Sequence, residues 1–228
     1  MAIKPILFNT EMVQAILDGR KTCTRRVVKT RRKDACGFYV TKRPDGSFTG
    51  IYEYDEDERM FENQLIPPYK PGDILYVRET WERFECWNCD GDERGNCQKE
   101  PKKSVLDKTF GCYMYRATDE ISGDAKWHPS IHMPKEAARI WLKATNVRAE
   151  RLQDITEDGA EAEGAIDNRG FIHSPENEYD RIYTAREHFI EIWDRTIKKS
   201  DLDSYGWDAN PWVWVIEFER CEPQEGHK

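Results

Sequence analysis

The chain lacks the long apolar runs of a membrane protein. None of its stretches approaches the roughly 18 to 20 consecutive apolar residues that a membrane-spanning helix needs. The first residues also lack the apolar core of a secretory signal peptide. We therefore expect a cytoplasmic protein that does not associate with membranes, and nothing in the sequence identifies a protein partner. Internal repeats are absent as well.

An excess of positive charge is also missing, because the formal net charge is -8 at pH 7. This value argues against non-specific coating of a long nucleic-acid duplex. The charges are unevenly distributed, however. Residues 20–33 are strongly basic, and an acidic run follows at residues 53–58. The asymmetry favours a local site for a phosphate-bearing ligand, and the alternative interpretation is a pair of solvated surfaces.

The segment 19–26 combines an amine and hydroxyl groups with several positive charges. Thr24 lies three residues after Lys21. Three arginines surround them in the sequence: Arg20, Arg25 and Arg26. A threonine hydroxyl is a weak nucleophile unless a base activates it, and a lysine can be that base if burial or nearby cations lower its pKa. The segment is therefore a candidate for both anion binding and chemistry.

A helix is predicted just before this segment, over residues 10–19. Thr10 is the expected N-cap, and Gly19 suits the left-handed position that ends a helix. If the chain then continues as a strand, Lys21 and Thr24 face opposite sides and meet only where the backbone turns or bulges. The alternative is a solvated basic turn whose threonines serve strand formation.

Strand signals outnumber helix signals in the rest of the chain. Strands are expected over residues 73–78, 113–117, 139–148 and 211–219, and helices over residues 156–164 and 184–197. Thr156 is the expected N-cap of the first of these helices. Trp212 and Trp214 share one face of the last strand, as core residues or as a platform for a base.

These elements predict an α+β fold, a small mixed β-barrel, mostly antiparallel, with flanking helices. The length suits a single domain over residues 1–228. Two polar segments read as insertions, at about residues 29–64 and 84–111. The first of them contains a candidate hairpin around residues 38–52.

Seven cysteines without a secretion signal indicate reduced thiols or metal ligands more than a disulfide framework. Four of them lie in or beside the second insertion: Cys86, Cys89, Cys97 and Cys112. Zinc accepts four such ligands, and a pair two residues apart can bind one ion. A second close pair is missing, so unligated thiols are the alternative. His128 and His132 are substitutes for one ligand, although Pro129 opposes a helical pair. Such a zinc would support the folding of the insertion and not catalysis.

Several segments together resemble the ASCH family of the PUA-like β-barrel superfamily. They span residues 16–24, 70–77, 152–164 and 214–218. Residues 127–134 also look like those of ASCH-domain proteins from bacteriophages and prophages, for which the host cytoplasm would be the location. The resemblance covers almost the whole chain and implies the PUA-like fold.

Small bacterial members of this family are amidohydrolases that deacetylate N4-acetylcytidine without a cofactor. By motif, the resemblance implies Thr24 as the nucleophile, Lys21 as its base and Glu163 as the proton donor to the leaving amine. Without the resemblance, Glu163 reads as a surface acid of a helix. This chain is longer than those hydrolases, so its insertions would either reshape the pocket for a larger substrate or block the reaction.

PUA-like barrels also imply RNA or nucleotides as partners. The expected ligand is therefore a modified nucleoside or RNA, with Arg20, Arg25 and Arg26 as the groups that bind phosphate. Two alternatives to the amidohydrolase stay open: a non-catalytic RNA-binding module and a ribonuclease that acts on single-stranded RNA.

Overall fold

The computed structural model describes residues 1–85, 102–104, 110–121, 126–169 and 183–223. The chain divides into two compact units. The first unit comprises residues 1–18, 73–143 and 220–228, and the second comprises residues 19–72 and 144–219. The expectation of one domain with two insertions stays a prediction.

The first unit contains a parallel strand pair. β1 (Ile3–Leu7) runs parallel to β6 (Ile74–Arg78), and β6 pairs in antiparallel fashion with the first residues of β10 (Trp141–Arg151). The Asp73 carboxylate fixes the start of this pair, because it accepts hydrogen bonds from the Ala2 N–H at 2.9 Å and from Lys4 Nζ at 2.8 Å. The strand predicted at residues 73–78 is thereby confirmed.

Helix α1 (Thr10–Leu17) follows β1 and confirms the predicted helix. Its N-cap is Asn9 and not Thr10, because the Asn9 side chain accepts a hydrogen bond from the Met12 N–H at 2.8 Å. An amide oxygen one residue earlier therefore satisfies one of the free N–H groups of the first turn. Gly19 has φ +77°, as expected for the left-handed position after a helix.

A second sheet of the first unit has the strand order β7-β9-β8. Its strands are β7 (Trp81–Glu85), β8 (Lys102–Lys103) and β9 (Phe110–Tyr115). Two short 3-10 helices follow, η3 (Ser130–His132) and η4 (Lys135–Ala137). Buried Tyr113, Tyr115 and Met133 form the core between these elements. Most of the insertion expected at residues 84–111 lies outside the described residues.

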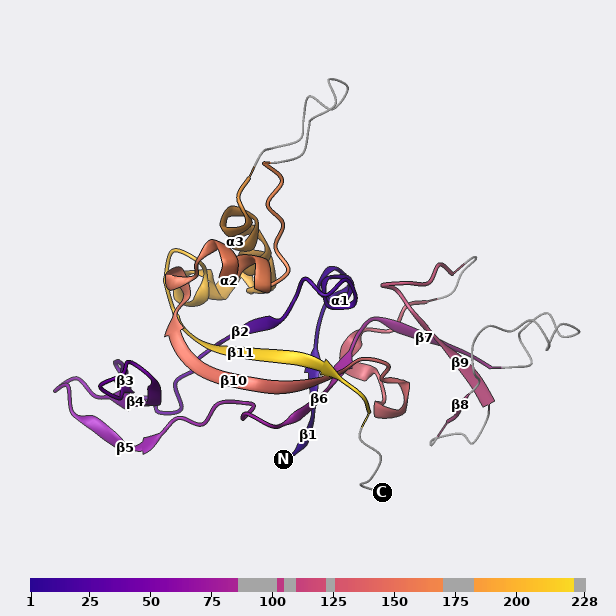
Figure 1. Ribbon diagram of the computed structural model, residues 1–228. Helices are drawn as coiled ribbons and strands as arrows, with labels where there is room; N and C mark the ends of the chain where they lie inside the picture. Colours follow the sequence, from indigo (N-terminus) through magenta and orange to yellow (C-terminus); the bar gives the residue numbers. More distant parts are fainter. Residues whose placement is uncertain (86–101, 105–109, 122–125, 170–182, 224–228) are drawn as a thin grey trace, which may run out of the picture. The chain divides into compact units, whose positions relative to one another are not determined.

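In the second unit, the strand order is β10-β11-β2. β2 (Cys23–Val27) is antiparallel to β11 (Trp212–Cys221), with Thr24 opposite Ile216 and Cys23 opposite Glu217. Figure 1 shows β10 and β11 as two long strands side by side, with β2 next to β11. The strands expected near residues 139–148 and 211–219 are thus confirmed with shifted ends.

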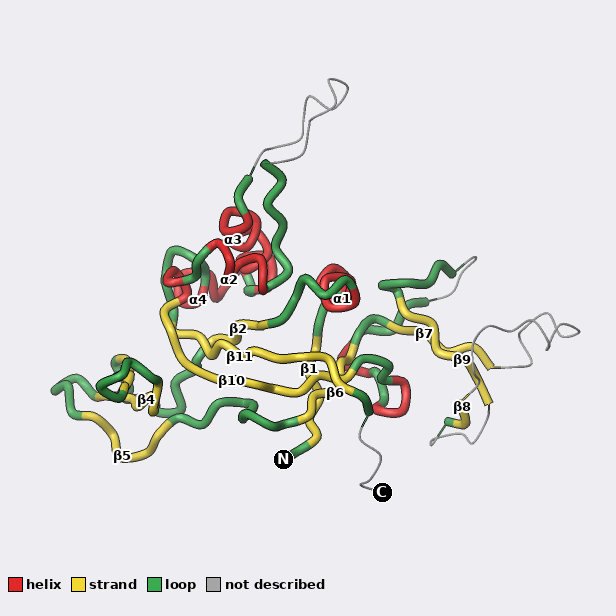
Figure 2. Tube along the Cα trace, viewed as in Figure 1, coloured by secondary structure: helices red, strands yellow, loops and turns green. Residues whose placement is uncertain are grey.

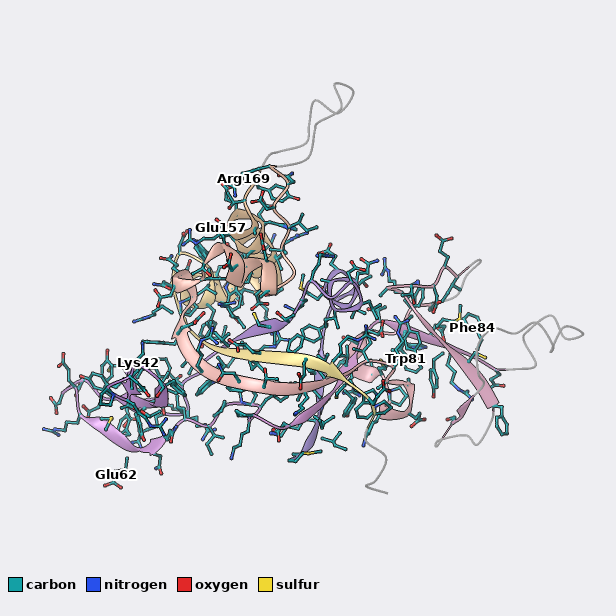
Figure 3. All side chains as sticks on the ribbon, viewed as in Figure 1. Lys42, Glu62, Trp81, Phe84, Glu157 and Arg169 are labelled. Carbon is teal, nitrogen blue, oxygen red and sulfur yellow. The ribbon has the colours of Figure 1, made fainter. Side chains whose placement is uncertain are left out.

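The predicted hairpin is also part of the second unit. An antiparallel three-stranded sheet is formed by β3 (Gly37–Lys42), β4 (Phe48–Tyr54) and β5 (Met60–Gln64). Lys42 of β3 and Glu62 of β5 are labelled in Figure 3. Ile51 of β4 is completely buried in one cluster with Trp214 and Ile216 of β11. Trp214 is therefore a core residue. Trp212 packs against the same cluster, and the Arg151 guanidinium lies 4.7 Å from its ring centroid.

The helices of the second unit gather in one group, drawn in red in Figure 2. They are η5 (Leu152–Asp154), α2 (Glu157–Ala162), α3 (Ala185–Thr196), η6 (Lys199–Asp201) and α4 (Leu202–Tyr205). Thr156 caps α2, as predicted, by accepting a hydrogen bond from the Gly159 N–H. Thr184 and Glu187 form a capping box at the start of α3. Buried Phe189, Ile192 and Trp193 line one face of α3.

The protein is therefore α+β and rich in sheet, as expected. None of the sheets in the described residues closes on itself by strand pairing. No helix in the described part of the chain is long and apolar enough to span a membrane.

Candidate functional site

Two backbone hydrogen bonds of Thr22, one through its N–H and one through its carbonyl, fix the short segment before β2. The Thr22 N–H donates to the Ala162 carbonyl at the end of α2, at 2.8 Å, and the Thr22 carbonyl accepts from the Phe218 N–H of β11, at 2.9 Å. These backbone bonds hold the segment between helix and strand. They bring Lys21, the residue before Thr22, next to the C-terminus of α2.

Glu163 occupies the C-cap position of α2, in a turn that requires glycine. Gly164 has φ +91°, which side-chain-bearing residues rarely adopt. The Gly164 N–H donates to the Glu161 carbonyl at 2.7 Å, and the Ala165 N–H donates to the Ala160 carbonyl at 3.1 Å. This pattern is the Schellman motif. The turn ends the helix at the residue that the family resemblance marks as the proton donor.

Lys21 and Glu163 form a buried ion pair. Lys21 Nζ lies 2.6 Å from Glu163 Oε2 and 2.7 Å from the Glu163 carbonyl oxygen. Only 1% of the Lys21 side chain and 7% of the Glu163 side chain are exposed. Burial lowers the pKa of Lys21 because it penalises the ammonium form, and the Glu163 carboxylate opposes this effect. Glu163 is therefore a buried partner of Lys21 and not a surface acid.

Arg25 approaches the same carboxylate from β2. Its Nη1 lies 3.3 Å from Glu163 Oε1, while its Nη2 and Nε lie 2.6 Å and 3.2 Å from Glu150 Oε1. Its side chain is 3% exposed. Arg25 thus bridges two carboxylates. Phosphate binding by Arg25 stays a prediction, although the guanidinium already has these two anionic partners.

The charge network continues along β10 toward solvent. Arg148 Nε donates to Glu150 Oε2 at 3.2 Å, and Arg148 Nη1 pairs with Glu217 Oε1 of β11. The exposed fraction of the side chains rises from 19% for Glu150 to 34% for Arg148 and 41% for Glu217. The network therefore extends from the buried Lys21 to the surface.

Thr24 is 1% exposed. Residues directly opposite each other in an antiparallel pair point to the same face, so Thr24 shares a face with Ile216. Cys23 and Arg25 point to the other face, the one with Glu217. The alternation expected for an extended segment is confirmed within β2. Lys21 lies before the strand, and its Nζ donates hydrogen bonds to Glu163 Oε2 and to the Glu163 carbonyl oxygen.

The other two predicted arginines differ from Arg25 in their surroundings. Arg20 is exposed and donates from Nη1 to the Gly164 carbonyl at 3.0 Å. Arg26 is half-buried and donates from Nη1 to the Arg25 carbonyl at 3.3 Å. Burial lowers the pKa of Arg26. Arg20 remains the most accessible of the three predicted phosphate ligands.

A pocket of about 360 Å³ lies beside Arg25. Its lining comes from β2, β10, β11 and α2 and their adjoining residues, and includes Cys23, Arg25, Thr145, Arg148, Glu217 and Phe218. The Cys23 thiol, 3.6 Å from Arg25 Nη1, is buried, and burial raises its pKa to about 12. The thiol is thus held in its unreactive protonated form.

Sequence reasoning missed Glu150, Arg148 and Glu217 as members of this network. The sequence carried only part of a signal: Arg148 ends the strand expected over residues 139–148, and Glu150 lies two positions later. The two side chains share a face because β10 continues to Arg151. Nothing local identified that face as the one that meets Arg25, because residues 25 and 150 are far apart in the sequence.

The predicted zinc ligands remain largely unplaced. Cys86, Cys89 and Cys97 lie outside the described residues. Cys112 is buried in β9. Within the described ranges, no group of three or more His, Cys, Asp or Glu side chains is arranged to hold a metal ion. The zinc site stays a prediction.

Comparisons with models of known families, with curated proteins and with solved structures gave no match for this chain.

Proposed function

We propose that the chain is a PUA-like protein of the ASCH type that binds a modified nucleoside and hydrolyses its exocyclic amide, as in N4-acetylcytidine. The observation that carries the proposal is the buried contact of Lys21 Nζ with Glu163 Oε2 at 2.6 Å. Two of the three residues that the motif marks are far apart in sequence and adjacent in the fold.

The chemistry follows from these side chains. Thr24 Oγ1 attacks the acyl carbon while its proton passes to the Lys21 amine, which must be neutral to accept it. This step requires the Thr24 hydroxyl, which lies on the Ile216 face of β2, to reach Lys21 across the start of the strand. The lowered pKa of Lys21 favours that neutral form. For this scheme the proton of the Lys21–Glu163 pair must first pass from the amine to the carboxylate, which leaves a neutral amine and a carboxylic acid. As the C–N bond breaks, N4 of the base takes that proton from Glu163. Water then attacks the acyl-threonine ester and gives a proton to the Glu163 carboxylate, while the threonine oxygen takes its proton back from Lys21, so that acetic acid leaves and both residues are restored.

One observation favours the alternative of a non-catalytic RNA-binding module. Glu163 binds Lys21 through both its carboxylate and its carbonyl oxygen, and two acceptors of this kind stabilise a protonated ammonium. A permanently charged Lys21 would serve anion binding and not proton abstraction. Exposed Arg20 would then add to a phosphate site.

The test is incubation of the purified protein with N4-acetylcytidine, followed by chromatography of released cytidine. Thr24→Ala removes the nucleophile, and Thr24→Ser keeps a hydroxyl at the same position. We expect cytidine from the wild type, less from the serine variant and none from the alanine variant. Circular dichroism shows that each variant is folded.

Unchanged release by Thr24→Ala would remove Thr24 from the mechanism. No release by the folded wild type would overturn the deacetylase proposal. Labelled single-stranded RNA then separates the alternatives, since a ribonuclease shortens the oligonucleotide and a binding module only retards it. Binding to phosphates must weaken as salt rises.

A further inference from the structure

We propose that Arg25, held by Glu150, is a positioning residue that fixes the Glu163 carboxylate so that one of its oxygens faces Lys21. This inference rests on the proposed function, in which Glu163 takes part in proton transfer. Arg25 itself need not touch the substrate.

The two oxygens of Glu163 have different partners. Arg25 Nη1 lies 3.3 Å from Oε1, and Lys21 Nζ lies 2.6 Å from Oε2. A carboxylate with one cation on each oxygen cannot rotate about its terminal bond without breaking both contacts. Arg25 therefore fixes the orientation of the carboxylate that Lys21 contacts. Because Arg25 shares the negative charge of Glu163, it also weakens the hold of Glu163 on the Lys21 ammonium.

Arg25 is in turn fixed on its other side. Nη2 and Nε both donate to Glu150 Oε1, at 2.6 Å and 3.2 Å. The Phe189 ring of α3 lies with its centroid 5.9 Å from the Arg25 guanidinium carbon. A Cβ atom at Gly159 of α2 would lie 3.4 Å from Nη2, so the helix backbone borders the guanidinium closely. The guanidinium thus has carboxylates on two sides and helices beside it.

A planar guanidinium is suited to this task and an ammonium is not. Its donors point in fixed directions, so it can bind two carboxylates at once, whereas a lysine has a single charged nitrogen on a flexible chain. Arg25→Met removes the charge while keeping an unbranched apolar stem. Arg25→Lys keeps the charge without the bridge. These two variants separate charge from geometry.

The first measurement is the pKa of Lys21 by NMR of protein carrying ¹⁵N-labelled lysine Nζ, with the signal assigned by its loss in Lys21→Arg. In Arg25→Met, we expect a higher Lys21 pKa than in the wild type, because Glu163 then acts on Lys21 alone. Arg151→Met is the matched control, since Arg151 is exposed in the same unit and contacts Trp212. An unchanged Lys21 pKa in folded Arg25→Met would overturn the inference.

The second measurement uses hydrolysis of N4-acetylcytidine. We expect kcat of Arg25→Met to fall by about 10²-fold with little change in KM, the loss typical of a misplaced catalytic group. Arg25→Lys should recover part of kcat. Glu150→Gln should lower kcat in the wild-type background and have no further effect in Arg25→Met, because Glu150 acts through Arg25. If the double variant lost as much kcat as the two single variants together, Glu150 would not act through Arg25.

The two measurements distinguish a failure of the proposed function from a failure of the positioning role. If the wild type does not hydrolyse N4-acetylcytidine, the proposed function fails, and the Lys21 pKa still decides whether Arg25 controls the pair. If hydrolysis occurs and Arg25→Met matches the wild type in both kcat and Lys21 pKa, the proposed function stands and the positioning role is refuted.

Discussion

Lys21 contacts Glu163 at two points, the carboxylate oxygen Oε2 at 2.6 Å and the carbonyl oxygen at 2.7 Å. The second contact places a cation at the carbonyl end of α2, where helix backbone oxygens lack intrahelical partners. One amine thus both pairs with an acid and caps the helix that carries it.

The first prediction concerns the stability of this pair. Lys21→Met should destabilise the protein by about 3 to 5 kcal/mol, because it leaves a buried carboxylate with one cation fewer. The free energy of unfolding in urea measures the loss. Lys21→Met combined with Glu163→Met should recover much of it, since no uncompensated charge then remains at this position. A double variant less stable than the single one would show that the pair itself stabilises the fold.

The second prediction concerns Gly164. Gly164→Ala forces a side chain into a left-handed conformation, which costs about 1 to 2 kcal/mol. Gly164→Asn should cost less, because asparagine tolerates that conformation better. Thermal unfolding compares the two variants. Equal melting temperatures for wild type and Gly164→Ala would mean that the turn after Glu163 is not rigid.

The third prediction concerns thiol reactivity. Cys23 is buried with a pKa raised to about 12 by burial, whereas Cys36 is exposed. Only the thiolate reacts with iodoacetamide. Alkylation of the native protein at pH 8 should therefore label Cys36 and leave Cys23 unlabelled, as read by peptide mass spectrometry. After denaturation both should react. Rapid labelling of native Cys23 would mean that its thiol is readily exposed to solvent through the adjoining pocket.

The fourth prediction concerns pH. The Cys23 pKa rises from 9.0 to about 12 on folding, so the native state holds the thiol proton in a range where the unfolded state has lost it. Stability from this group is full below pH 9 and declines as pH rises toward 12. Cys23→Ala lacks this contribution. The stability of the wild type relative to Cys23→Ala should therefore fall between pH 8 and pH 10.5, measured by urea unfolding at each pH.

Much of the secondary structure could be predicted from local patterns. Thr156 correctly predicted the start of α2, and Gly19 correctly predicted where the chain leaves α1. The N-cap of α1 was misplaced by one residue because Asn9 and Thr10 are both good caps, and the sequence alone does not decide between them.

Long-range relationships could not be predicted in the same way. β1 pairs in parallel with β6, about 70 residues away, and neither strand carries a local sign of its partner. At the candidate site, the resemblance to the ASCH family pointed to Lys21, Thr24 and Glu163, but the arginines were judged only by their charge. The structure gives Arg25 two carboxylate partners, which depend on how β2 meets β10 and α2.

The spacing of Arg148 and Glu150 has a consequence for how this chain can vary. Both side chains act from one face of β10 because they are two positions apart in the strand. Deleting Ala149, with Arg148 held in place, would leave the composition of β10 almost intact and turn the Glu150 side chain to the opposite face. The length of β10 is therefore under tighter constraint than the identity of most residues in it. Related chains that keep this network should vary in length at their loops and not within this strand.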